Sequence, residues 1–449
     1  MGKYFGTDGF RGVANETLTS RNAYDIGRFL GYYCKNQENK RARIVIGKDT
    51  RLSSYMLEYS VAAGITASGG DAYMLHVTTT PGVSYVCRQD DFDFGIMITA
   101  SHNPYTDNGI KIINRYGEKL DDATTAKVEE YLDSGEDLPL ARGEDIGRVV
   151  DYVSGRNRYL GYLISLASNS YKGLRIGLDC ANGATHLLAR SVFGALGAQL
   201  YTLGCEPNGL NINRGCGSTD TEKLRKTVVE NHLDIGFAFD GDGDRCIAVD
   251  EKGCEVDGDK IMYILARRLK DRGMLSDGTV VATVMSNSGF FKALERGGMK
   301  CIQTKVGDRF VYECMQKGDY SLGGEQSGHI IMRKYATTGD GILTAIMMCE
   351  ELCDRKTTLS DLASPVKLYP QYTKNVRVAD KKKAIQNALV QEKFMEVQGL
   401  IGENGRALLR ESGTEPVIRI MIESESEMLC RKYADMISGA MEEEGLARG

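Results

Sequence analysis

The chain has 449 residues, and at roughly 100 to 200 residues per domain this length predicts three or four domains rather than one small binding module. A hydrophobic content of 42% and a charged content of 26% are typical of a globular chain, while a net charge of −5 argues against a general nucleic-acid-binding surface. The sequence offers neither a membrane-spanning apolar segment nor a recognisable signal peptide, and its twelve cysteines include no C-x-x-C pair. We therefore expect a cytoplasmic protein with reduced thiols that binds neither membranes nor nucleic acid.

The predicted elements repeat along the chain. A short apolar strand that ends in Gly or Asp is followed by a helix and then by a second apolar strand, and this occurs three times. The first strands are predicted at 43–49, 174–179 and 280–284. The second strands run directly into polar loops that contain Ser101, Asp240 and Glu325. Ligands gather at the carboxyl ends of strands in α/β domains. We therefore expect three similar α/β domains with mixed sheets, each supplying one loop to a shared cleft.

The final part of the chain has a different pattern. It predicts a strand at 375–378, a helix over 381–397, two strands around 410–414, and a helix from Glu425 to the region of Met441. Isoleucines at 418, 420 and 422 fall on one face of a strand and Arg419 on the other, which indicates a small α+β domain. The run Lys381-Lys382-Lys383 is most simply interpreted as a solvated face. The four expected domains span 1–152, 153–254, 255–367 and 368–449.

The loop from Asp240 to Arg245, with the sequence DGDGDR, carries the most specific chemical signal. Three carboxylates in five residues repel one another, and the alternating glycines let the backbone fold so that all three converge. A hard divalent cation such as Mg²⁺ or Ca²⁺ would remove this repulsion through all-oxygen ligation. The alternative to a cation site is a solvated acidic turn between two strands. An EF-hand loop with Glu251 at its last position is disfavoured, because Arg245 replaces the required glycine and both flanks are strand-like.

The loop around Ser101, with the sequence TASHNP, follows a strand that is expected to be buried. A serine there is held by the scaffold and exposed to the cleft, as a nucleophile or phosphate carrier must be. A turn or helix-capping serine before Pro104 is the alternative, and the loop lacks the G-x-S-x-G pattern of hydrolases. The amino-terminal GTDGFRG could be a flexible turn, or a glycine-rich hinge that places Arg11 on a phosphate. Lys111, after the serine, could act in the same way.

Two further loops carry weaker signals. The third repeat offers a carboxylate, an amide, a hydroxyl and an imidazole, from Glu325, Gln326, Ser327 and His329. Such a set can hydrogen-bond sugar hydroxyls, with the imidazole as a proton carrier near neutral pH. The segment 410–416 with Arg419 gathers guanidinium groups, hydroxyls and backbone amides that could clamp a phosphate. Taken alone, an exposed polar turn and an ordinary hairpin turn would look the same.

Five segments, taken in chain order, resemble the motifs of the α-D-phosphohexomutase superfamily over essentially the whole sequence: GTDGFRG, TASHNPYTDNGIK, DGDGDR, GEQSGH and RESGTEP. The resemblance implies four domains around a central cleft and a phosphoryl group carried by Ser101. It implies Mg²⁺ held by Ser101, Asp240, Asp242 and Asp244. It also implies contacts with a small sugar-phosphate substrate from Glu325, Gln326, Ser327, Lys305, Arg410, Ser412, Gly413, Thr414 and Arg419. A homodimer is what the family suggests.

Within the superfamily, Gln326 and the segment Gly339-Asp340-Gly341 favour the branch that acts on glucosamine phosphates, because the mannose and glucose branch more typically carries Met in place of Gln326. The resemblance then implies a phosphoserine enzyme and a glucosamine 1,6-bisphosphate that is both intermediate and activator. The net reaction would interconvert glucosamine 6-phosphate and glucosamine 1-phosphate. The expected catalytic residues are Ser101, Arg11, Lys111, His329 and Arg245, with either His329 or Lys111 moving the proton.

Two alternatives stay open at this point. A phosphomannomutase/phosphoglucomutase on the same scaffold differs only in substrate, and a non-catalytic Ca²⁺-binding or sugar-phosphate-sensing protein would keep the aspartate loop. The sequence also departs from the superfamily pattern at two positions. Glu411 stands where the phosphate loop usually has proline, and Asp220 stands where the glucosamine branch often has His. These departures bear on affinity for the distal phosphate and on the choice of substrate.

Overall fold

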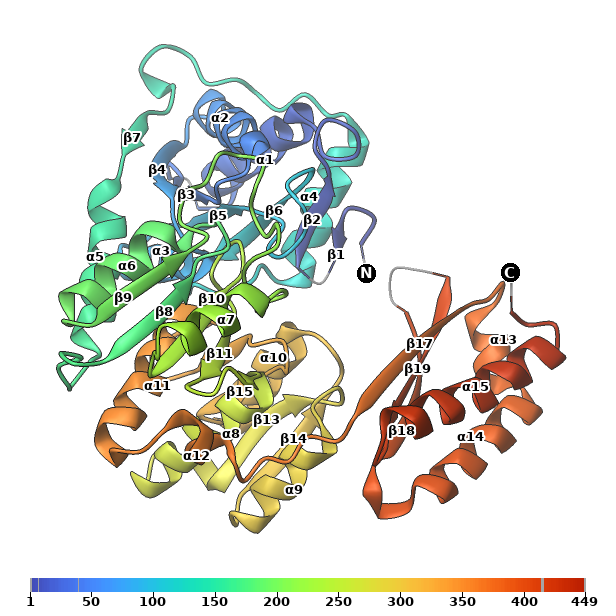
Figure 1. Ribbon diagram of the computed structural model, residues 1–449. Helices are drawn as coiled ribbons and strands as arrows, with labels where there is room; N and C mark the ends of the chain where they lie inside the picture. Colours follow the sequence, from blue (N-terminus) through green and yellow to red (C-terminus); the bar gives the residue numbers. More distant parts are fainter. Residues whose placement is uncertain (1, 7, 39, 413–415, 448–449) are drawn as a thin grey trace. The chain divides into compact units, whose positions relative to one another are not determined.

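The computed structural model describes residues 2–6, 8–38, 40–412 and 416–447 (Figure 1). The chain forms two compact units. The larger unit comprises Met1–Met285 and Met299–Ser364, and the smaller comprises Ser286–Gly298 and Pro365–Gly449. The polypeptide therefore passes between the two units at three points.

The first sheet of the larger unit has seven strands in the order β1-β2-β6-β5-β3-β4-β7. Strands β5, β3, β4 and β7 are parallel, and β6, β2 and β1 extend the sheet in antiparallel fashion. Helices α1, α2 and α4 cover an aliphatic core on one face, and α3 packs on the other, where Gly47 and Gly95 leave room for Val83. The bounds are β1 Phe5–Gly6, β2 Gly9–Val13, α1 Ser20–Glu38, β3 Arg43–Lys48, α2 Leu52–Ala67, β4 Asp71–Val77, α3 Thr80–Gln89, β5 Phe94–Ile98, β6 Asp107–Asn114, α4 Asp122–Ser134 and β7 Val149–Asp151.

The second sheet has five strands in the order β12-β11-β10-β8-β9, and the third has four in the order β14-β13-β15-β16. The bounds around the second sheet are α5 Val153–Ser165, β8 Arg175–Asp179, α6 Thr185–Ala195, β9 Gln199–Leu203, α7 Glu222–Glu230, β10 Ile235–Phe239, β11 Cys246–Asp250 and β12 Glu255–Val256. Those around the third are α8 Gly258–Asp271, β13 Thr279–Thr283, β14 Lys300–Thr304, α10 Asp308–Gly318, β15 Leu322–Gly324, β16 Ile330–Met332, α11 Gly341–Arg355 and α12 Leu359–Ala363.

The three sheets repeat one arrangement of four strands. The order of neighbours is β6-β5-β3-β4 in the first sheet, β11-β10-β8-β9 in the second and β16-β15-β13-β14 in the third. In each, the first strand of the sequence repeat lies between two parallel neighbours, and the second apolar strand turns back into an antiparallel partner. The prediction of three similar α/β domains with mixed sheets is confirmed.

The smaller unit has an antiparallel sheet in the order β17-β19-β18, and the prediction of an α+β domain is confirmed. The isoleucines of β19 are fully buried against α14 and α15, as their alternation predicted. The helix expected over 381–397 is instead two helices, because Asn387 caps α14 by accepting a hydrogen bond of 3.2 Å from the Val390 N–H. The bounds are α9 Ser288–Arg296, β17 Gln371–Arg377, α13 Lys381–Gln386, α14 Ala388–Ile401, β18 Arg406–Glu411, β19 Val417–Glu423 and α15 Glu427–Glu443.

Helix α9 belongs to the smaller unit although it follows β13 along the chain. Ser288, at its start, donates hydrogen bonds from its backbone N–H and its Oγ to Glu423 of β19, at 3.0 and 2.5 Å. Asn287 donates from Nδ2 to the carbonyl of Tyr369 at 2.9 Å. The expected limits of the four domains, and their arrangement around one cleft, stay predictions.

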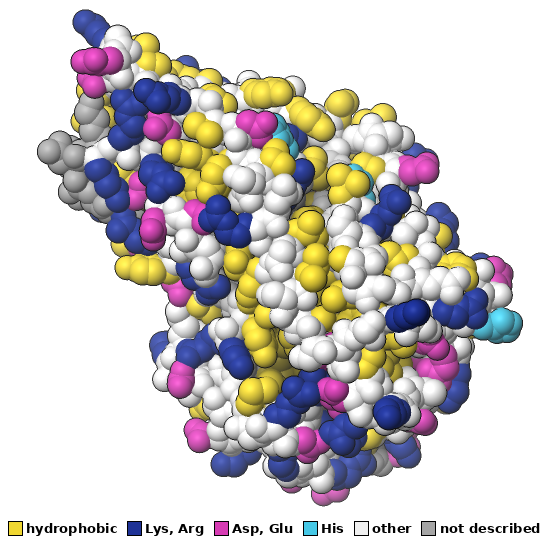
Figure 2. Space-filling model, turned by 90° about the vertical axis from the view of Figure 1, so that its left-hand side faces the viewer, with side chains coloured by type: hydrophobic (Ala, Val, Ile, Leu, Met, Phe, Trp, Pro, Cys, Tyr) yellow, Lys and Arg dark blue, Asp and Glu magenta, His cyan; other side chains and the backbone are white. Residues whose placement is uncertain are grey.

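Positive and negative side chains lie interspersed with hydrophobic ones on the face drawn in Figure 2. Within the described ranges, no helix combines the length and the apolar character that crossing a membrane requires.

Candidate active site

The three site loops occupy equivalent turns of the three sheets (Figure 1). Ser101 follows β5, Asp240 follows β10 and Glu325 follows β15, so each lies where a parallel strand turns back into its antiparallel partner. The serine loop (residues 99–104) and the aspartate loop (residues 240–245) meet directly. A Cβ atom on Gly241 would lie 2.5 Å from the carbonyl oxygen of Ser101. Glycine is therefore required at this position for the two loops to approach.

Ser101 is buried and points at the aspartate loop. Its Oγ donates a hydrogen bond of 2.6 Å to Oδ2 of Asp240 and lies 3.3 Å from Nδ1 of His102. Its φ angle of 52° lies in the left-handed region, which residues with a side chain seldom occupy. Such strain persists where surrounding contacts impose it. The structure thus brings together the serine and the aspartates that the sequence placed in separate domains.

Asp240, Asp242 and Asp244 form a buried carboxylate cluster, in which one oxygen of each lies within 4.8 Å of the others. Burial, and then repulsion by Asp244 and Asp242, raise the pKa of Asp240 well above its usual value. Oδ1 of Asp242 and Oδ1 of Asp244 are buried without a hydrogen-bond partner in the described part of the chain. A divalent cation would neutralise the repulsion and coordinate these oxygens, so the cluster fits a hard metal ion.

Two cations lie against the carboxylate cluster. The ammonium of Lys111, on β6, is 2.9 Å from Asp242, 3.3 Å from Asp244 and 3.1 Å from Asp8. Arg245 directly follows the cluster, and although burial opposes its charged form, attraction by the neighbouring aspartates raises its pKa. Both side chains therefore stay charged beside the carboxylate cluster and can compensate negative charge there.

Arg11 lies in strand β2 and not on the flexible turn that the glycines suggested. Strand β2 pairs with β6, and the Arg11 guanidinium forms an ion pair with Asp8. Asp8, which sequence reasoning missed, also contacts Lys111 and Lys119, at 3.1 and 2.8 Å. These cations hold its pKa well below the ordinary value despite its burial. The motif GTDGFRG shows that an acidic residue lies near Arg11, but nothing in it indicates the contacts with Lys111 and Lys119.

Thr80, in the first turn of α3, is a second residue that sequence reasoning missed. Its Oγ1 donates to Oδ2 of Asp242 at 2.5 Å, and its N–H donates to the carbonyl of the same residue at 2.9 Å. These bonds join the aspartate loop of the second sheet to a helix that packs on the first. The local sequence TTTP signals the start of a helix, but no local pattern names a partner so far along the chain.

His329 is buried beside the carboxylate cluster. Its Nδ1 lies 3.6 Å from Oδ1 of Asp244, and its Nε2 accepts a hydrogen bond of 3.0 Å from the Gly339 N–H. An accepting Nε2 places the proton of a neutral imidazole on Nδ1, facing Asp244. His329 and Lys111 both contact carboxylates of the cluster, so the geometry keeps both as candidates for proton transfer.

The other sugar-binding candidates are grouped less closely. Glu325 accepts a hydrogen bond of 3.1 Å from a backbone N–H just before α10, and burial raises its pKa. Gln326 donates to Oδ2 of Asp257, the capping residue of α8, at 3.4 Å. Ser327 is exposed, and Lys305 is exposed with its ammonium 6.0 Å from the centroid of an aromatic ring. Of these four residues, Glu325 is the one whose pKa is also affected by the nearby charges of His329 and Arg245.

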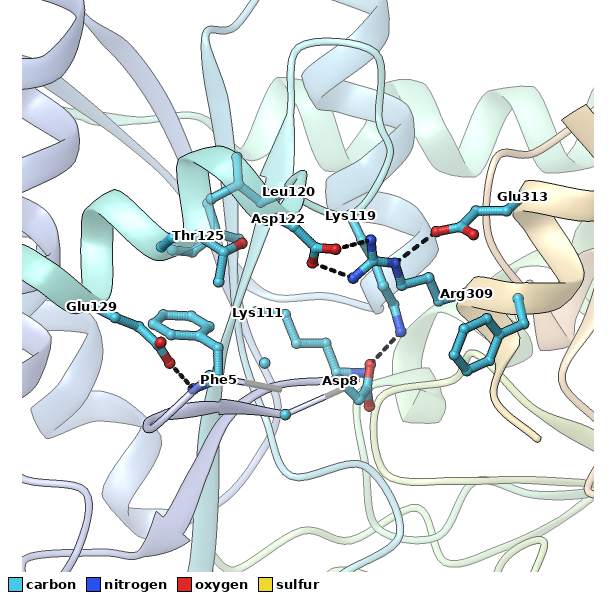
Figure 3. Close-up of a pocket in the computed structure, with 16 residues that line it drawn as sticks. Phe5, Asp8, Lys111, Lys119, Leu120, Asp122, Thr125, Glu129, Arg309 and Glu313 are labelled. Carbon is cyan, nitrogen blue, oxygen red and sulfur yellow. Dashed lines mark hydrogen bonds and ion pairs between the residues drawn. The ribbon is translucent and has the colours of Figure 1, made fainter. Parts of the chain in front are cut away.

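A cavity of about 480 Å³ adjoins Lys111 (Figure 3). Its lysine and arginine lining residues form ion pairs with nearby carboxylates. Lys119 bridges Asp8 and Asp308 at 2.8 and 2.6 Å, and Arg309 of α10 pairs with an aspartate at the start of α4. A sugar phosphate entering this cavity would meet cations that are already neutralised. The cavity therefore offers space beside the cluster rather than a ready anion site.

The smaller unit carries two like charges near one end of its sheet. Arg410 of β18 and Arg419 of β19 lie directly opposite one another. Burial, and then repulsion by Arg419, lower the pKa of Arg410, so an anion bound between them would relieve an unfavourable interaction. Lys381 donates to the carbonyl of Ser412 at 2.7 Å and is therefore more than part of a solvated face. Two other members of the expected phosphate loop lie outside the described residues: Gly413 and Thr414.

The chain matches all four domain models of the phosphoglucomutase/phosphomannomutase family. The alpha/beta/alpha domains I, II and III match residues 2–138, 157–253 and 257–369, and the C-terminal domain matches residues 374–440. The chain belongs to this family, which confirms the predicted phosphohexomutase superfamily and the prediction of an enzyme.

Curated relatives extend this result along the whole chain. Phosphoglucosamine mutase from Lachnospira eligens is 57% identical over 450 residues, covering 100% of both chains. Phosphoglucosamine mutase from Bacillus subtilis is 50% identical over 438 residues, covering 97% of this chain and 98% of the relative.

Solved structures of lower identity share the fold. A phosphoglucomutase/phosphomannomutase family protein from Burkholderia thailandensis has a TM-score of 0.82 at 23% identity, covering 99% of this chain and 98% of its own. N-acetylphosphoglucosamine mutase from Aspergillus fumigatus, in complex with GlcNAc-6P and magnesium, has a TM-score of 0.70 at 17% identity, covering 98% and 96%.

Proposed function

We propose that this enzyme interconverts glucosamine 6-phosphate and glucosamine 1-phosphate. Relatives called phosphoglucosamine mutase are 57% and 50% identical over nearly the whole chain. The observation that carries the proposal is the 2.6 Å hydrogen bond from Ser101 Oγ to Asp240, at the edge of a buried carboxylate cluster that fits a metal ion. A phosphoryl group on Ser101 would place its oxygens beside that ion.

The proposed ion is Mg²⁺, held by Asp240, Asp242, Asp244 and the phosphorylated Ser101. When bound, it supplies Lewis-acid stabilisation of the charge that develops on the transferring phosphoryl group. Lys111 now contacts two aspartates of the cluster, at 2.9 and 3.3 Å. Once the aspartates are neutralised, its ammonium becomes available to the phosphoryl oxygens. Arg245 and Arg11 add positive charge on the same side.

The chain's own residues account for the remaining steps. The 1-hydroxyl of glucosamine 6-phosphate attacks phosphorus and gives its proton to a neutral His329, or to Lys111 once that side chain has lost its own proton. The bond from phosphorus to Ser101 Oγ breaks, and Oγ takes up a proton in return. The product of this half-reaction is glucosamine 1,6-bisphosphate. After the sugar reorients, Ser101 Oγ accepts the 6-phosphoryl group and the 6-oxygen regains a proton. In both orientations Glu325 would bind sugar hydroxyls.

The smaller unit would hold the phosphate that is not being transferred. Arg410 and Arg419 supply two guanidinium groups on neighbouring strands, and Ser412 follows at the end of β18. Arginine pairs bidentately with phosphate, which suits a site that must accept either end of the bisphosphate.

Substrate choice can be measured directly. Gln326 hydrogen-bonds to Asp257, so any effect of this residue on substrate choice would be indirect. We expect kcat/KM to be higher for glucosamine 6-phosphate than for glucose or mannose 6-phosphate. A preference for mannose or glucose 6-phosphate would favour the phosphomannomutase/phosphoglucomutase alternative. The homodimer and the cytoplasmic location stay expectations.

The covalent scheme is tested at Ser101. We expect mass spectrometry of the purified protein to find Ser101 at least partly phosphorylated, and Ser101→Ala to abolish turnover. An unmodified serine together with an active alanine variant would falsify the scheme. An unmodified serine together with no turnover by the parent protein would instead favour a binding or sensing protein over an enzyme with a phosphoserine.

The metal site is tested with Asp240→Asn. Because Asp240 is repelled by its neighbours, the variant should unfold at an equal or higher temperature than the parent when no Mg²⁺ is added. It should lose both turnover and the rise in unfolding temperature on adding Mg²⁺. Glu230→Gln, an exposed change in the same domain, is the matched control and should keep both. Full turnover of the parent in excess chelator would contradict the metal assignment.

A further inference from the structure

Arg51 is a fully buried arginine whose guanidinium faces the backbone of the serine loop. Its Nη2 donates hydrogen bonds of 2.9 and 3.0 Å to the carbonyls of Ser101 and Asn103. Its Nη1 donates to the carbonyls of Pro104 and Asp107. Four carbonyl groups from one short segment therefore converge on a single planar group, and the loop is shaped around that group.

Asp49 completes this network on the other side. Its Oδ2 accepts hydrogen bonds of 2.7 Å from Nε of Arg51 and from Oγ1 of Thr99. Oγ1 of Thr99 in turn accepts the backbone N–H of Ser101 at 2.9 Å. One buried ion pair thus fixes both sides of Ser101: Arg51 holds its C=O directly, and Asp49 holds its N–H through Thr99.

We propose that Arg51, together with Asp49, positions the phosphoryl carrier, by holding Ser101 in its left-handed conformation so that Oγ points at Asp240. The inference rests on the proposed function, in which Ser101 carries the phosphoryl group. Arg51 is 0% exposed and its charge is balanced by Asp49, so it acts on the loop backbone and does not bind phosphate. It is a positioning residue and makes no contact with substrate.

The position of Ser101 Oγ affects the rate of the reaction, because phosphoryl transfer depends on the alignment of the reacting atoms. Phosphoryl transfer needs the attacking oxygen, the phosphorus and the leaving oxygen in line, and a misplacement of about 1 Å can cost 100-fold in rate. Sugar hydroxyls and the distal phosphate are bound elsewhere, so a relaxed serine loop leaves substrate affinity in place. Loss of the network should therefore lower kcat and leave KM nearly unchanged.

Arg28 provides a matched control in the same domain. It is also a buried arginine, and it anchors a different loop through the carbonyls of Leu138 and Pro139 and through Oγ of Ser68. That loop contributes no residue to the proposed site. Arg28→Lys removes the same kind of anchor as Arg51→Lys, so a purely structural role would make the two variants behave alike.

The experiment compares Arg51→Lys, Thr99→Val and Arg28→Lys by thermal unfolding and by kcat and KM for glucosamine 6-phosphate. Thr99→Val keeps the shape of the side chain and removes only the hydroxyl between Asp49 and Ser101. We expect Arg51→Lys to lower kcat about 100-fold and Thr99→Val to lower it by a smaller factor, both with KM within about twofold of the parent. We expect Arg28→Lys to lose stability and keep its kcat.

Two outcomes overturn the proposal: parental kcat in both Arg51→Lys and Thr99→Val, or losses of kcat that merely follow the loss of stability and are matched by Arg28→Lys. If Arg51→Lys does not fold, Thr99→Val decides alone. Ser101→Ala is measured in parallel. An active Ser101→Ala variant overturns the proposed function itself, whereas an inactive one beside fully active Arg51 and Thr99 variants overturns only the positioning role.

Discussion

Asp340 is a buried carboxylate whose surroundings disfavour its charge. It accepts a hydrogen bond of 2.7 Å from the hydroxyl of Tyr159, and it caps α11 through the Leu343 N–H at 3.0 Å. Burial nevertheless raises its pKa to about 6, with a further contribution from Asp244. Because the pKa is higher in the folded protein than in the unfolded chain, ionisation opposes folding. The protonated Asp340 carboxyl is the form that the fold favours. Its contribution to the free energy of unfolding is therefore complete below pH 3.8 and is lost as the pH rises through about 6.

We therefore expect Asp340→Asn to stabilise the protein at neutral pH. Asparagine is an equally good helix cap through its one amide oxygen, and its Nδ2 would then donate to the hydroxyl oxygen of Tyr159. The difference of about two between the two pKa values corresponds to at most roughly 3 kcal/mol in the free energy of unfolding. Urea denaturation should show this gain at about pH 7.5 and little of it at about pH 4. A gain that is the same at both values would contradict the argument, and Asp220→Asn should give none at either.

Some residues of the candidate site could be predicted from the sequence alone, and others could not. Ser101 and the three aspartates were identifiable because nucleophile and metal-ligand chemistry leaves a local pattern. Asp8 and Thr80 were missed, because their roles come from contacts with side chains far away in the sequence. No local pattern encodes such contacts, so these roles require coordinates.

At the scale of elements, apolar alternation predicted most strands, and two failures have clear causes. Strand β2 has the sequence GFRGV, whose glycines resemble a turn, and its extended form depends on pairing with β6, far along the chain. The helix expected over 381–397 ends early because Asn387 satisfies the first free N–H groups of a new helix. Periodicity of apolar residues reports a buried face and does not report such a break.

The meeting of the serine and aspartate loops can be tested with Gly241→Ala. The added Cβ would lie 2.5 Å from a backbone oxygen, which cannot swing aside as a side chain can. We expect a loss of roughly 1–3 kcal/mol in stability and a lower kcat, since the loops must separate. Gly161→Ala, on α5, meets nothing within 4 Å and should be neutral or slightly stabilising. Thermal unfolding and steady-state kinetics on both variants decide it: parental values for Gly241→Ala would refute the contact.

The strand ends of the smaller unit give a second test at this scale. Lys381 donates to the Ser412 carbonyl, whereas its neighbour Lys382 is exposed. Removing this support from the proposed phosphate site should raise KM for glucosamine 6-phosphate several-fold, with a smaller effect on kcat. We expect this of Lys381→Ala and not of Lys382→Ala, measured by initial rates at saturating glucosamine 1,6-bisphosphate. Equal KM values for the two variants would show that Lys381 does not support the phosphate site and is a solvated lysine like Lys382.

At the scale of the whole molecule, one strand arrangement used three times explains why the site loops come from residues so far apart. In each sheet a parallel strand turns back into an antiparallel neighbour at the same position. The three turns carry the serine, the aspartate cluster and the glutamate in that order along the chain. The sequence showed both the repeated pattern and which loop of each repeat carries the candidate site residues. The grouping of α9 with the carboxyl-terminal unit was not visible, because α9 follows β13 in the same alternating pattern as every other helix.

That grouping makes a prediction about cooperative opening. Glu423, fully buried in β19, accepts hydrogen bonds from Ser288 at the start of α9 and from Arg406 of β18 at 3.0 Å. In native-state hydrogen exchange under mild denaturant, α9 should lose protection together with α14 and α15, while α10, the next helix along the chain, follows the larger unit. Glu423→Gln should lower the opening free energy of all three helices of the smaller unit by roughly 1–3 kcal/mol.

Glu427→Gln is the control for this experiment, because Glu427 is exposed and its ion pair among the described residues is an i,i+4 pair with Arg431 on α15. Such surface pairs contribute roughly 0.5 kcal/mol or less, so protection of α9 should hardly change. If α9 instead exchanged in step with α10, and Glu423→Gln left it unaffected, the helix would belong to the larger unit. The hydrogen bonds from Ser288 to Glu423 would then be contacts across a boundary rather than within one folded body.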